Sequence, residues 1–398
     1  MEPIIKTYDW GSHEALARLQ GRDTPSAGPE AELWMGAHPA GPSGVTRDGR
    51  TRGLHDVVSE APERELGAEC VAHFGGRLPF LLKVLAADQP LSIQVHPDRK
   101  QARDAFGVQA ANGGEGPYSD DWPKPELLYA LSPFEVLAGF RTRTEAAAVL
   151  DGLGVEGLRP VVALLESGSD ETALTAALGA LLEQPACDRE PLVREVVEAS
   201  ARLADERGPH AQAYGAVVHM ERHHPGDLGL VASLLLRHRI LEAGSALYMP
   251  AGGLHAYVRG VGVELMAASD NVLRAGLTTK EVNVPELLRI TDPAVRVPVV
   301  APRAVAGPGR THVFECPAEE FTLYRTELTA EGVPLVPSGG PRIVLCTQGT
   351  ARLRGPDGDV VTLHPGASCF VPDSDQGVTV EGAGTVFVAG AGLAVHLP

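Results

Sequence analysis

A ten-residue pattern that occurs twice constrains the fold of this chain more than any other feature of the sequence. Residues 241–250 (LEAGSALYMP) and 363–372 (LHPGASCFVP) both place a glycine three residues after a leucine and a proline six residues after that glycine. Each copy carries a short apolar run between these turn formers, which is typical of a β-strand. His255 stands five residues after the first proline, whereas Gly377 stands at the same offset after the second. We therefore predict two related β units, of which only the first keeps a metal ligand.

This turn, strand and proline pattern recurs in cupin-type jelly rolls, in which two sheets enclose a small cavity. The chain has 45 glycines and 32 prolines among 398 residues, which favours a turn-rich β architecture. Between about residues 142 and 222 the apolar residues recur at helical spacing instead. The sequence therefore predicts a mainly β chain with two jelly-roll barrels and an inserted helical domain. The predicted units are residues 1–140 with 224–290 as the metal-binding jelly roll, 141–223 as the helical domain, and 291–398 as a second jelly roll without a metal site.

Charge and cysteine usage narrow the class of protein. The net charge of −17 repels nucleic-acid backbones, although a local basic pocket can still hold a small phosphorylated ligand. Five cysteines without a CxxC pair fit a reducing compartment better than a disulfide framework. The N-terminus has no apolar core of a signal peptide, and we find no apolar run long enough to span a bilayer. We expect a cytoplasmic protein that binds neither nucleic acid nor membranes.

Four side chains form a candidate metal site. Gln94 and His96 are two residues apart, so on a strand they share one face. Glu126 starts an apolar run, where a buried carboxylate needs a partner, and His255 follows two glycines that permit a close backbone approach. Singly, each residue is more often a core histidine or a solvent-facing strand end. Together, an amide oxygen, a carboxylate and two imidazoles suit a divalent ion such as Zn²⁺.

Two further segments bear on the site. Arg274 and Lys280 lie within one short glycine-containing stretch, and two cations near a metal pocket can hold an anion such as phosphate. A solvated loop with surface ion pairs is the alternative role for this stretch. Residues 104–121, which contain Asn-Gly-Gly and Ser-Asp-Asp, are predicted to form a long loop and a candidate lid.

Several motifs resemble, in the same order along the chain, those of the type I phosphomannose isomerase family. The resemblance covers residues 5 to about 290, and beyond that only the outline of the second jelly roll matches. One departure is Trp122-Pro123, which stands where many relatives carry Asn-His. The matching motifs are Tyr8–Ser12, Ala31–Pro39, Pro79–Leu85, Leu91–Asp98, Lys124–Leu127, Pro225–Gly229 and His255–Lys280.

The resemblance implies an enzyme that interconverts mannose 6-phosphate and fructose 6-phosphate through a cis-enediol, with one zinc ion per chain. It would serve GDP-mannose synthesis or mannose catabolism, and we expect a monomer. The implied zinc ligands are Gln94, His96, Glu126 and His255. The implied substrate-binding residues are Trp10, Glu32, Ser92, Tyr257, Asp270 and Lys280, and the implied catalytic residues are Arg274, Lys83, Lys124 and Glu264.

Acid–base chemistry limits which residue can carry the proton in the implied mechanism. Descriptions of the family assign a catalytic role to the arginine at the Arg274 position, yet a guanidinium is hard to deprotonate. We therefore expect Arg274 to stabilise negative charge and to hold the phosphate with Lys280 and Ser92. The proton would be carried by Lys83, Lys124 or Glu264, because a buried lysine shifts its pKa readily.

Two readings from other classes remain open at this point. An iron-dependent cupin oxygenase needs two histidines and one carboxylate, which His96, His255 and Glu126 would supply. The cations and Gln94 argue against it, and activity without oxygen discriminates the two. A non-catalytic sugar-phosphate-binding cupin would bind the same ligand without turnover, but every ligand position here is filled.

Overall fold

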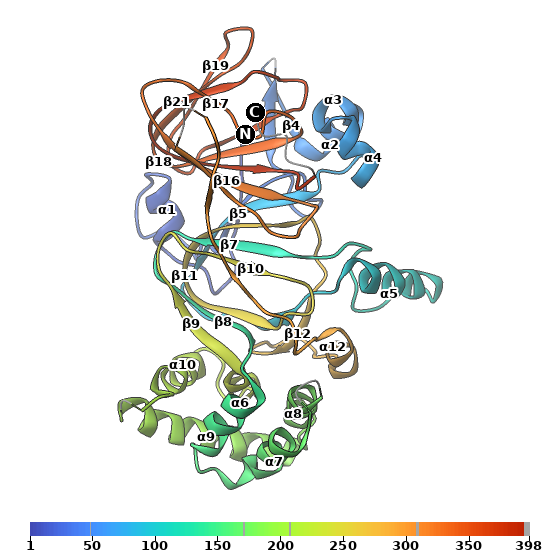
Figure 1. Cartoon of the computed structure of the whole chain (residues 1–398), viewed down its shortest axis with the longest axis vertical. Coiled ribbons are helices and arrows are strands. Elements are labelled where there is room, and N and C mark those ends of the chain that lie inside the picture. The colour runs from blue at the N-terminus through green and yellow to red at the C-terminus, as the bar shows by residue number, and fades with distance from the viewer. Residues whose placement is uncertain (48, 170–171, 207, 308–309, 394–398) are drawn as a thin grey trace.

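The computed structural model describes residues 1–47, 49–169, 172–206, 208–307 and 310–393. Within these ranges the molecule is elongated, with one large sheet in the middle, a second large sheet at one end and a group of helices at the other (Figure 1). This mainly β architecture with a helical insertion confirms the predicted class. Among the described residues no helix is both long enough and apolar enough to cross a bilayer.

The middle sheet has eleven strands and carries every predicted metal ligand. Its main path runs β1-β2-β5-β11-β7-β10-β13, with β6 and β8 paired to β11, β9 paired to β8, and β12 paired to β6. The apolar runs near residues 78–85, 91–96 and 127–131 form β5, β6 and β7. The strands are β1 (Ile4–Lys6), β2 (Glu32–Met35), β5 (Phe80–Ala87), β6 (Ile93–Val95), β7 (Glu126–Ala130), β8 (Phe134–Phe140), β9 (Leu236–Leu241), β10 (Ala246–Met249), β11 (His255–Ala267), β12 (Leu273–Gly276) and β13 (Val299–Val300).

The long strand β11 joins the two parts of this sheet. Its first residues pair with β6 and β8, and from Gly260 onward it pairs with β5 and β7. Gly260 has a φ of +145°, and a Cβ there would lie 2.6 Å from the ring of Phe134. Only glycine fits this crossing point. The strand thereby brings His255 from one part and Glu264 from the other toward the same interior.

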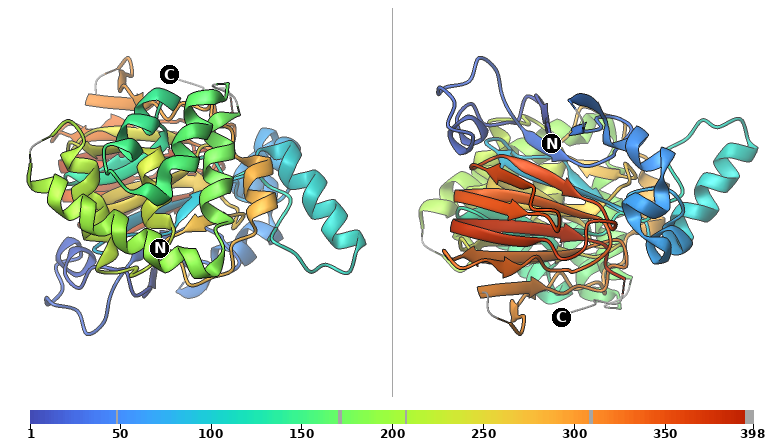
Figure 2. Two further views of the ribbon diagram at one scale, coloured as in Figure 1. Left: turned by 90° about the horizontal axis from the view of Figure 1, so that it is seen from below. Right: turned by 90° about the horizontal axis from the view of Figure 1, so that it is seen from above.

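The helical insertion runs from Arg143 to Glu221 and packs on one end of the middle sheet. Figure 2 shows these helices covering that end (left view). The side chains of Ile93 and Val95 on β6 belong to the same apolar cluster as the helices. The insertion therefore forms the floor on which β6 lies. Its elements are α6 (Arg143–Asp151), η1 (Glu156–Leu158), α7 (Arg159–Ser167), α8 (Ala173–Leu182), α9 (Ala186–Asp205) and α10 (Ala211–Glu221), followed by α11 (Gly229–Ala232) and η2 (Ser233–Leu235).

The prediction of a loop over residues 104–121 is wrong for its first part. Helix α5 (Arg99–Ala111) projects from the body of the molecule (Figure 1). Asp98 and Gln101 form a reciprocal capping box at its start, and this start signal was overlooked. The irregular segment begins only after the helix, where the Tyr118 hydroxyl donates to Glu286 on α12 (Val284–Ile290) at 2.5 Å.

The remaining N-terminal elements flank the middle sheet on the side of the second sheet. Helices α2, α3 and α4 lie beside the C-terminal strands (Figure 2, right view). These elements are α1 (Ala15–Leu19), the hairpin β3 (Gly44–Arg47) and β4 (Arg50–Gly53), α2 (Leu54–Glu60), α3 (Pro62–Leu66) and α4 (Ala68–Phe74).

The C-terminal sheet has eight strands and shares a core with the middle sheet. Its path runs β14-β15-β16-β21-β18-β19, with β17 paired to β21 and β20 paired to β18. Phe321, Leu345 and Phe387 lie in one apolar cluster with Leu82 and Val263 of the middle sheet. The two sheets therefore support each other. The strands are β14 (Arg303–Ala304), β15 (Arg310–Phe314), β16 (Thr322–Leu328), β17 (Val333–Pro334), β18 (Arg342–Arg354), β19 (Val360–Leu363), β20 (Ser368–Val371) and β21 (Thr379–Gly390).

The repeated pattern forms the same local structure in both sheets. Gly244 and Gly366 have φ values of +97° and +78°, and the strands β10 and β20 follow them. The turn conformation at these glycines is one that other residues rarely adopt. In the described residues we find no closed barrel, so the two jelly-roll barrels stay a prediction.

The buried Arg342 organises one end of the C-terminal sheet. Only 1% of it is exposed, and its guanidinium donates to the carbonyls of Ser338 at 3.1 Å, Pro372 at 2.6 Å and Asp375 at 2.9 Å. Burial lowers the pKa of this side chain to about 10, against the opposing charges of Asp373 and Asp375. The guanidinium thus remains charged at neutral pH and joins two loops.

We expect Arg342→Met to lower the free energy of unfolding by about 3 kcal/mol, because it leaves these buried carbonyls without donors. Urea denaturation measures the change. Arg354→Met is the matched control, because Arg354 is half exposed and makes one long ion-pair contact, 3.8 Å, to Glu381. This variant should change the free energy of unfolding by less than about 0.5 kcal/mol. Equal effects of the two substitutions would contradict a structural role for Arg342.

Candidate active site

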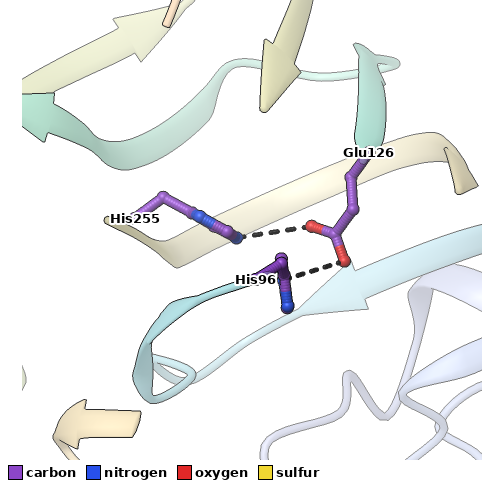
Figure 3. A group of neighbouring side chains, drawn as sticks. All are labelled: His96, Glu126 and His255. Carbon is purple, nitrogen blue, oxygen red and sulfur yellow. Dashed lines mark ion pairs between the residues drawn. The ribbon is translucent and has the colours of Figure 1, made fainter. Parts of the chain in front are cut away.

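Three buried side chains of the middle sheet converge on one point. Nε2 of His96 lies 3.3 Å from Oε1 of Glu126, and Nε2 of His255 lies 3.3 Å from Oε2 of the same carboxylate (Figure 3). One ligand atom from each residue lies within 4.8 Å of the other two, and none of the residues is more than 2% exposed. This spacing allows one ion to contact all three groups.

The ends of neighbouring strands place these groups. Glu126 is the first residue of β7, His255 is the first residue of β11, and His96 directly follows β6. Gly252, with a φ of +78°, donates its N–H to the carbonyl of His96 at 2.9 Å. The glycine turn before β11 therefore holds the backbone of one histidine next to the other, which is the close approach expected from the two glycines.

Backbone carbonyls fix the orientation of both imidazoles. Nδ1 of His96 lies 2.7 Å from the carbonyl oxygen of Asn271, and Nδ1 of His255 lies 3.0 Å from that of Gly253. A carbonyl only accepts, so each Nδ1 carries a proton, and each Nε2 faces Glu126. This arrangement, with the second ring nitrogen hydrogen-bonded to a carbonyl, is typical of metal-ligating histidines.

The protonation states of His96 and Glu126 leave a buried negative charge in the cluster. Burial lowers the pKa of His96 to about 4, although Glu126 opposes the shift, so the ring is neutral at pH 7. Burial also disfavours the charge of Glu126, but His96 and Lys124 outweigh it and hold its pKa well below the usual range. Nε2 of both histidines and Oε2 of Glu126 have no hydrogen-bond partner among the described residues. Three buried acceptors without a donor are a costly arrangement, and a divalent ion would satisfy it.

Gln94 lies on the same face of β6 as the cluster. It is directly opposite His255 on β11 and opposite Arg274 on β12. Residues opposite each other in antiparallel strands present their side chains on one face, and the neighbouring Ile93 and Val95 face the helical insertion. Gln94 is therefore in a position to add its amide oxygen beside His255.

Arg274, opposite Gln94, is a cation without a hydrogen-bond or ion-pair partner among the described residues. It is half buried, and its side chain makes no hydrogen bond or ion pair with another described residue. Burial lowers its pKa from the usual value for arginine. An unpaired guanidinium next to Gln94 suits an anionic ligand. Lys280, by contrast, is exposed after β12, and no side-chain contact joins it to the cluster within the described chain.

A second buried cluster lies on strands β2, β5 and β11. Nζ of Lys83 is 3.3 Å from Glu32 and 3.2 Å from Glu264, and the Glu32 carboxylate also accepts from the indole of Trp34 at 2.8 Å. Burial opposes the charge of Lys83, but Glu32 and Glu264 outweigh it and raise its pKa above the usual range. Burial likewise raises the pKa of Glu264, with Lys83 opposing. Lys83 therefore stays protonated, which argues against it as a base.

The other predicted site residues differ in how deeply they are buried. Lys124 lies at the metal cluster, with Nζ 3.3 Å from Oε1 of Glu126. Trp10 stacks on Tyr8 with the ring centres 5.7 Å apart and packs with Tyr257 in one apolar cluster. The Tyr257 hydroxyl is buried without a hydrogen-bond partner among the described residues, and burial raises its pKa well above the usual value. Ser92 is half buried directly before β6.

Sequence reasoning missed the residues that hold the loop beside the cluster. The amide of Asn271 accepts from the N–H of Ser119 at 2.8 Å and donates to the carbonyls of Asp120 and Trp122, each at 2.8 Å. The same residue orients His96 through its own carbonyl. Asn271 and Asp120 are 151 positions apart in the sequence, so only their contact in the folded chain reveals this role.

The departure at Trp122-Pro123 gives the loop an aromatic anchor. Trp122 is buried, packs at 5.9 Å from the ring of Phe74 and lies under the guanidinium of Arg77 at 4.3 Å. These contacts tie the loop to α4. Trp122 therefore fastens this loop to the body of the molecule.

Comparison with known proteins gives the same picture as the geometry. Residues 1–143 match the family model "Phosphomannose isomerase type I, catalytic domain", and residues 310–390 match "Mannose-6-phosphate isomerase, cupin domain". The chain is 34% identical to the mannose-6-phosphate isomerase of Escherichia coli K12, covering 96% of each chain, and 32% identical to that of Schizosaccharomyces pombe, covering 92% of each.

Solved structures extend the similarity to the whole fold. A mutant phosphomannose isomerase from Salmonella typhimurium superimposes with a TM-score of 0.89 at 32% identity, covering 98% of both chains. A mannose 6-phosphate isomerase bound with zinc and yttrium superimposes with a TM-score of 0.87 at 32% identity over the same share.

Proposed function

This chain is an enzyme of the type I phosphomannose isomerase family, and from that premise we propose that it interconverts D-mannose 6-phosphate and D-fructose 6-phosphate with the help of zinc. The observation that carries the zinc assignment is a set of three buried atoms, Nε2 of His96, Oε2 of Glu126 and Nε2 of His255, that have no hydrogen-bond partner among the described residues. Two imidazoles and a carboxylate match the ligands that zinc prefers.

Zinc would be held by these three residues with Gln94 as the fourth ligand. When bound, it would act as a Lewis acid that polarises the sugar carbonyl and stabilises the negative charge of the enediolate. The carbonyls of Asn271 and Gly253 keep both Nε2 atoms aimed at the ion. The donor set also suits other borderline metals, but the family membership favours zinc over the iron of an oxygenase.

The proposed reaction moves one carbon-bound proton. In the forward direction C2 of mannose 6-phosphate loses its proton, the cis-enediolate forms, and C1 gains a proton; the hydroxyl proton moves from O2 to O1. Lys83 stays charged between Glu32 and Glu264, so we assign it an electrostatic role. This leaves Lys124 and Glu264 as the groups that carry the proton. Arg274 stays a guanidinium and stabilises negative charge.

Deuterium exchange tests the reaction and its chemistry together. Mannose 6-phosphate incubated with the protein in D₂O should yield fructose 6-phosphate with deuterium at C1, and recovered mannose 6-phosphate should carry deuterium at C2. Nuclear magnetic resonance measures both. Conversion without any deuterium would contradict proton exchange with solvent through the proposed base. Binding without conversion in a metal-loaded sample would indicate the non-catalytic alternative.

Arg274, together with Lys280 and Ser92, is proposed to hold the phosphate. We expect Arg274→Met to raise KM for mannose 6-phosphate by about tenfold or more, because a charge-assisted contact to phosphate is lost. Steady-state kinetics measures the change. Arg259→Met is the control, since the Arg259 side chain is 61% exposed and faces Glu135 at 3.6 Å. An unchanged KM with a normal kcat in the Arg274 variant would contradict the assignment.

The sugar itself is proposed to contact Trp10, Tyr257, Glu32 and Asp270. The buried Tyr257 hydroxyl is available as a donor, and the carboxylates accept from sugar hydroxyls. The proposed units remain residues 1–140 with 224–290, 141–223 and 291–398, with each sheet-bearing unit a jelly roll; residues 308–309 and 394–398 of the last unit lie outside the described residues. A cytoplasmic monomer that serves GDP-mannose synthesis or mannose catabolism completes the proposal.

A further inference from the structure

A cavity of about 380 Å³ lies beside the candidate active site, and one wall carries a carboxylate and an imidazole. Its lining includes His38, Ser119, Trp122 and Asp270. The side chain of Asp270 is 50% exposed, whereas that of His38 is 6% exposed. Nε2 of His38 lies 3.4 Å from Oδ2 of Asp270. A buried imidazole therefore supports a carboxylate that faces open space.

The environment of His38 fixes which nitrogen carries the proton. The N–H of Ala40 donates to Nδ1 of His38 at 3.2 Å, so Nδ1 is the acceptor of the neutral ring. Nε2 then carries the proton and lies within ion-pair distance of Asp270. Burial lowers the pKa of His38, with the charge of Asp270 opposing, which keeps the ring neutral. The edge of the ring packs on Trp34, with the centres 5.2 Å apart and the planes at 82°.

The backbone of Asp270 is held from the other side. Its N–H donates to Oδ2 of Asp120 at 3.0 Å, and Oδ1 of Asp120 accepts from Ser269 at 2.8 Å. Among the described side chains, His38 is the one within ion-pair distance of the Asp270 carboxylate. Asp120 thus fixes the main chain and His38 lies beside the carboxylate, whose remaining lone pairs accept no hydrogen bond from the described residues.

We propose that His38 is a positioning residue that holds the Asp270 carboxylate ready to accept a hydroxyl group of the sugar phosphate. This inference rests on the proposed function, because it assigns the free lone pairs of Asp270 to that substrate. The N–H of the neutral imidazole lies 3.4 Å from the carboxylate and leaves the negative charge on it, so Asp270 can accept from the sugar. His38 acts through Asp270 and does not itself touch the substrate.

A double-mutant cycle tests the coupling. We expect His38→Leu to lower kcat/KM for mannose 6-phosphate by about tenfold in the parent protein and by less than about twofold when Asp270→Ala is already present. His38→Gln, whose amide still donates, should recover most of the lost activity. A merely structural role would give the same loss in both backgrounds, and this result would overturn the inference.

A second readout keeps the test independent of turnover. The same cycle can be measured on the Kd of mannitol 6-phosphate, which has no carbonyl and cannot be isomerised, by calorimetry on the zinc-loaded protein. Non-additive losses in Kd support the inference even if the parent protein proves inactive, which would overturn the proposed function alone. Additive losses overturn the inference. His55→Leu is the matched control, because His55 lines the same cavity and faces Asp56 at 3.1 Å instead of Asp270.

Discussion

Replacement of His255 by alanine is expected to remove bound zinc and turnover together. The substitution takes one of three buried ligands from the cluster and leaves Glu126 with His96 and Lys124. We expect kcat to fall by at least about a thousandfold, because Lewis-acid stabilisation of the enediolate contributes several kcal/mol at about 1.4 kcal/mol per tenfold in rate. Metal analysis after dialysis and steady-state kinetics with mannose 6-phosphate measure the two losses.

His223→Ala is the control for this experiment. His223 lies just after α10 in the helical insertion and packs against His219 at 5.4 Å, away from the three-residue cluster. The control variant should keep one zinc ion per chain and normal turnover. A His255 variant that retains stoichiometric zinc and normal turnover would contradict the assigned site.

The second large effect is expected at Lys83. Lys83→Met leaves Glu32 and Glu264, both buried, without the charge that compensates them. Removing one partner of a buried ion pair typically costs about 3–5 kcal/mol. We therefore expect the free energy of unfolding to fall by about 3 kcal/mol. Turnover should fall by about a hundredfold as the electrostatic contribution of the ammonium group is lost. Urea denaturation and steady-state kinetics separate the two effects.

A neutral cluster separates stability from catalysis. The triple variant Glu32→Gln, Lys83→Met and Glu264→Gln removes all three charges at similar volume, and it should recover most of the lost stability without recovering turnover. Lys100→Met is the surface control, since Lys100 is 85% exposed and pairs only with Asp104 among the described residues. A single Lys83 variant as stable and active as the parent would show that the lysine is dispensable to the two carboxylates.

Much of the fold follows from local signals in the sequence. Short apolar runs between glycines and prolines predict β5, β6 and β7, and helical spacing predicts the insertion. These signals work because strand and helix periods differ within a few residues. Helix α5 was not predicted because the glycines and polar residues that follow it indicate a loop, although Asp98 is a helix start signal. The closure of the sheets depends on contacts between distant strands, which local patterns do not contain.

The candidate site also contains residues that the sequence predicts and residues that only the fold brings together. The types and spacings of Gln94, His96, Glu126 and His255 point to a metal, because their chemistry can be read one residue at a time. The paired carboxylates around Lys83 depend on the register of β11 with β5, which places Glu264 opposite Lys83. The contact between His38 and Asp270 joins residues more than two hundred positions apart. Such partners become visible only once the chain is folded.

The measurement that tests the central claim most directly is formation of fructose 6-phosphate from mannose 6-phosphate by the purified protein, before chelation, after chelation and after zinc is added back. We predict turnover that chelation abolishes and zinc restores, with zinc bound at one ion per chain in the active samples. Absence of turnover in a folded, zinc-loaded sample would contradict the isomerase assignment. Full turnover after complete removal of the metal would contradict the role of the cluster formed by His96, Glu126 and His255.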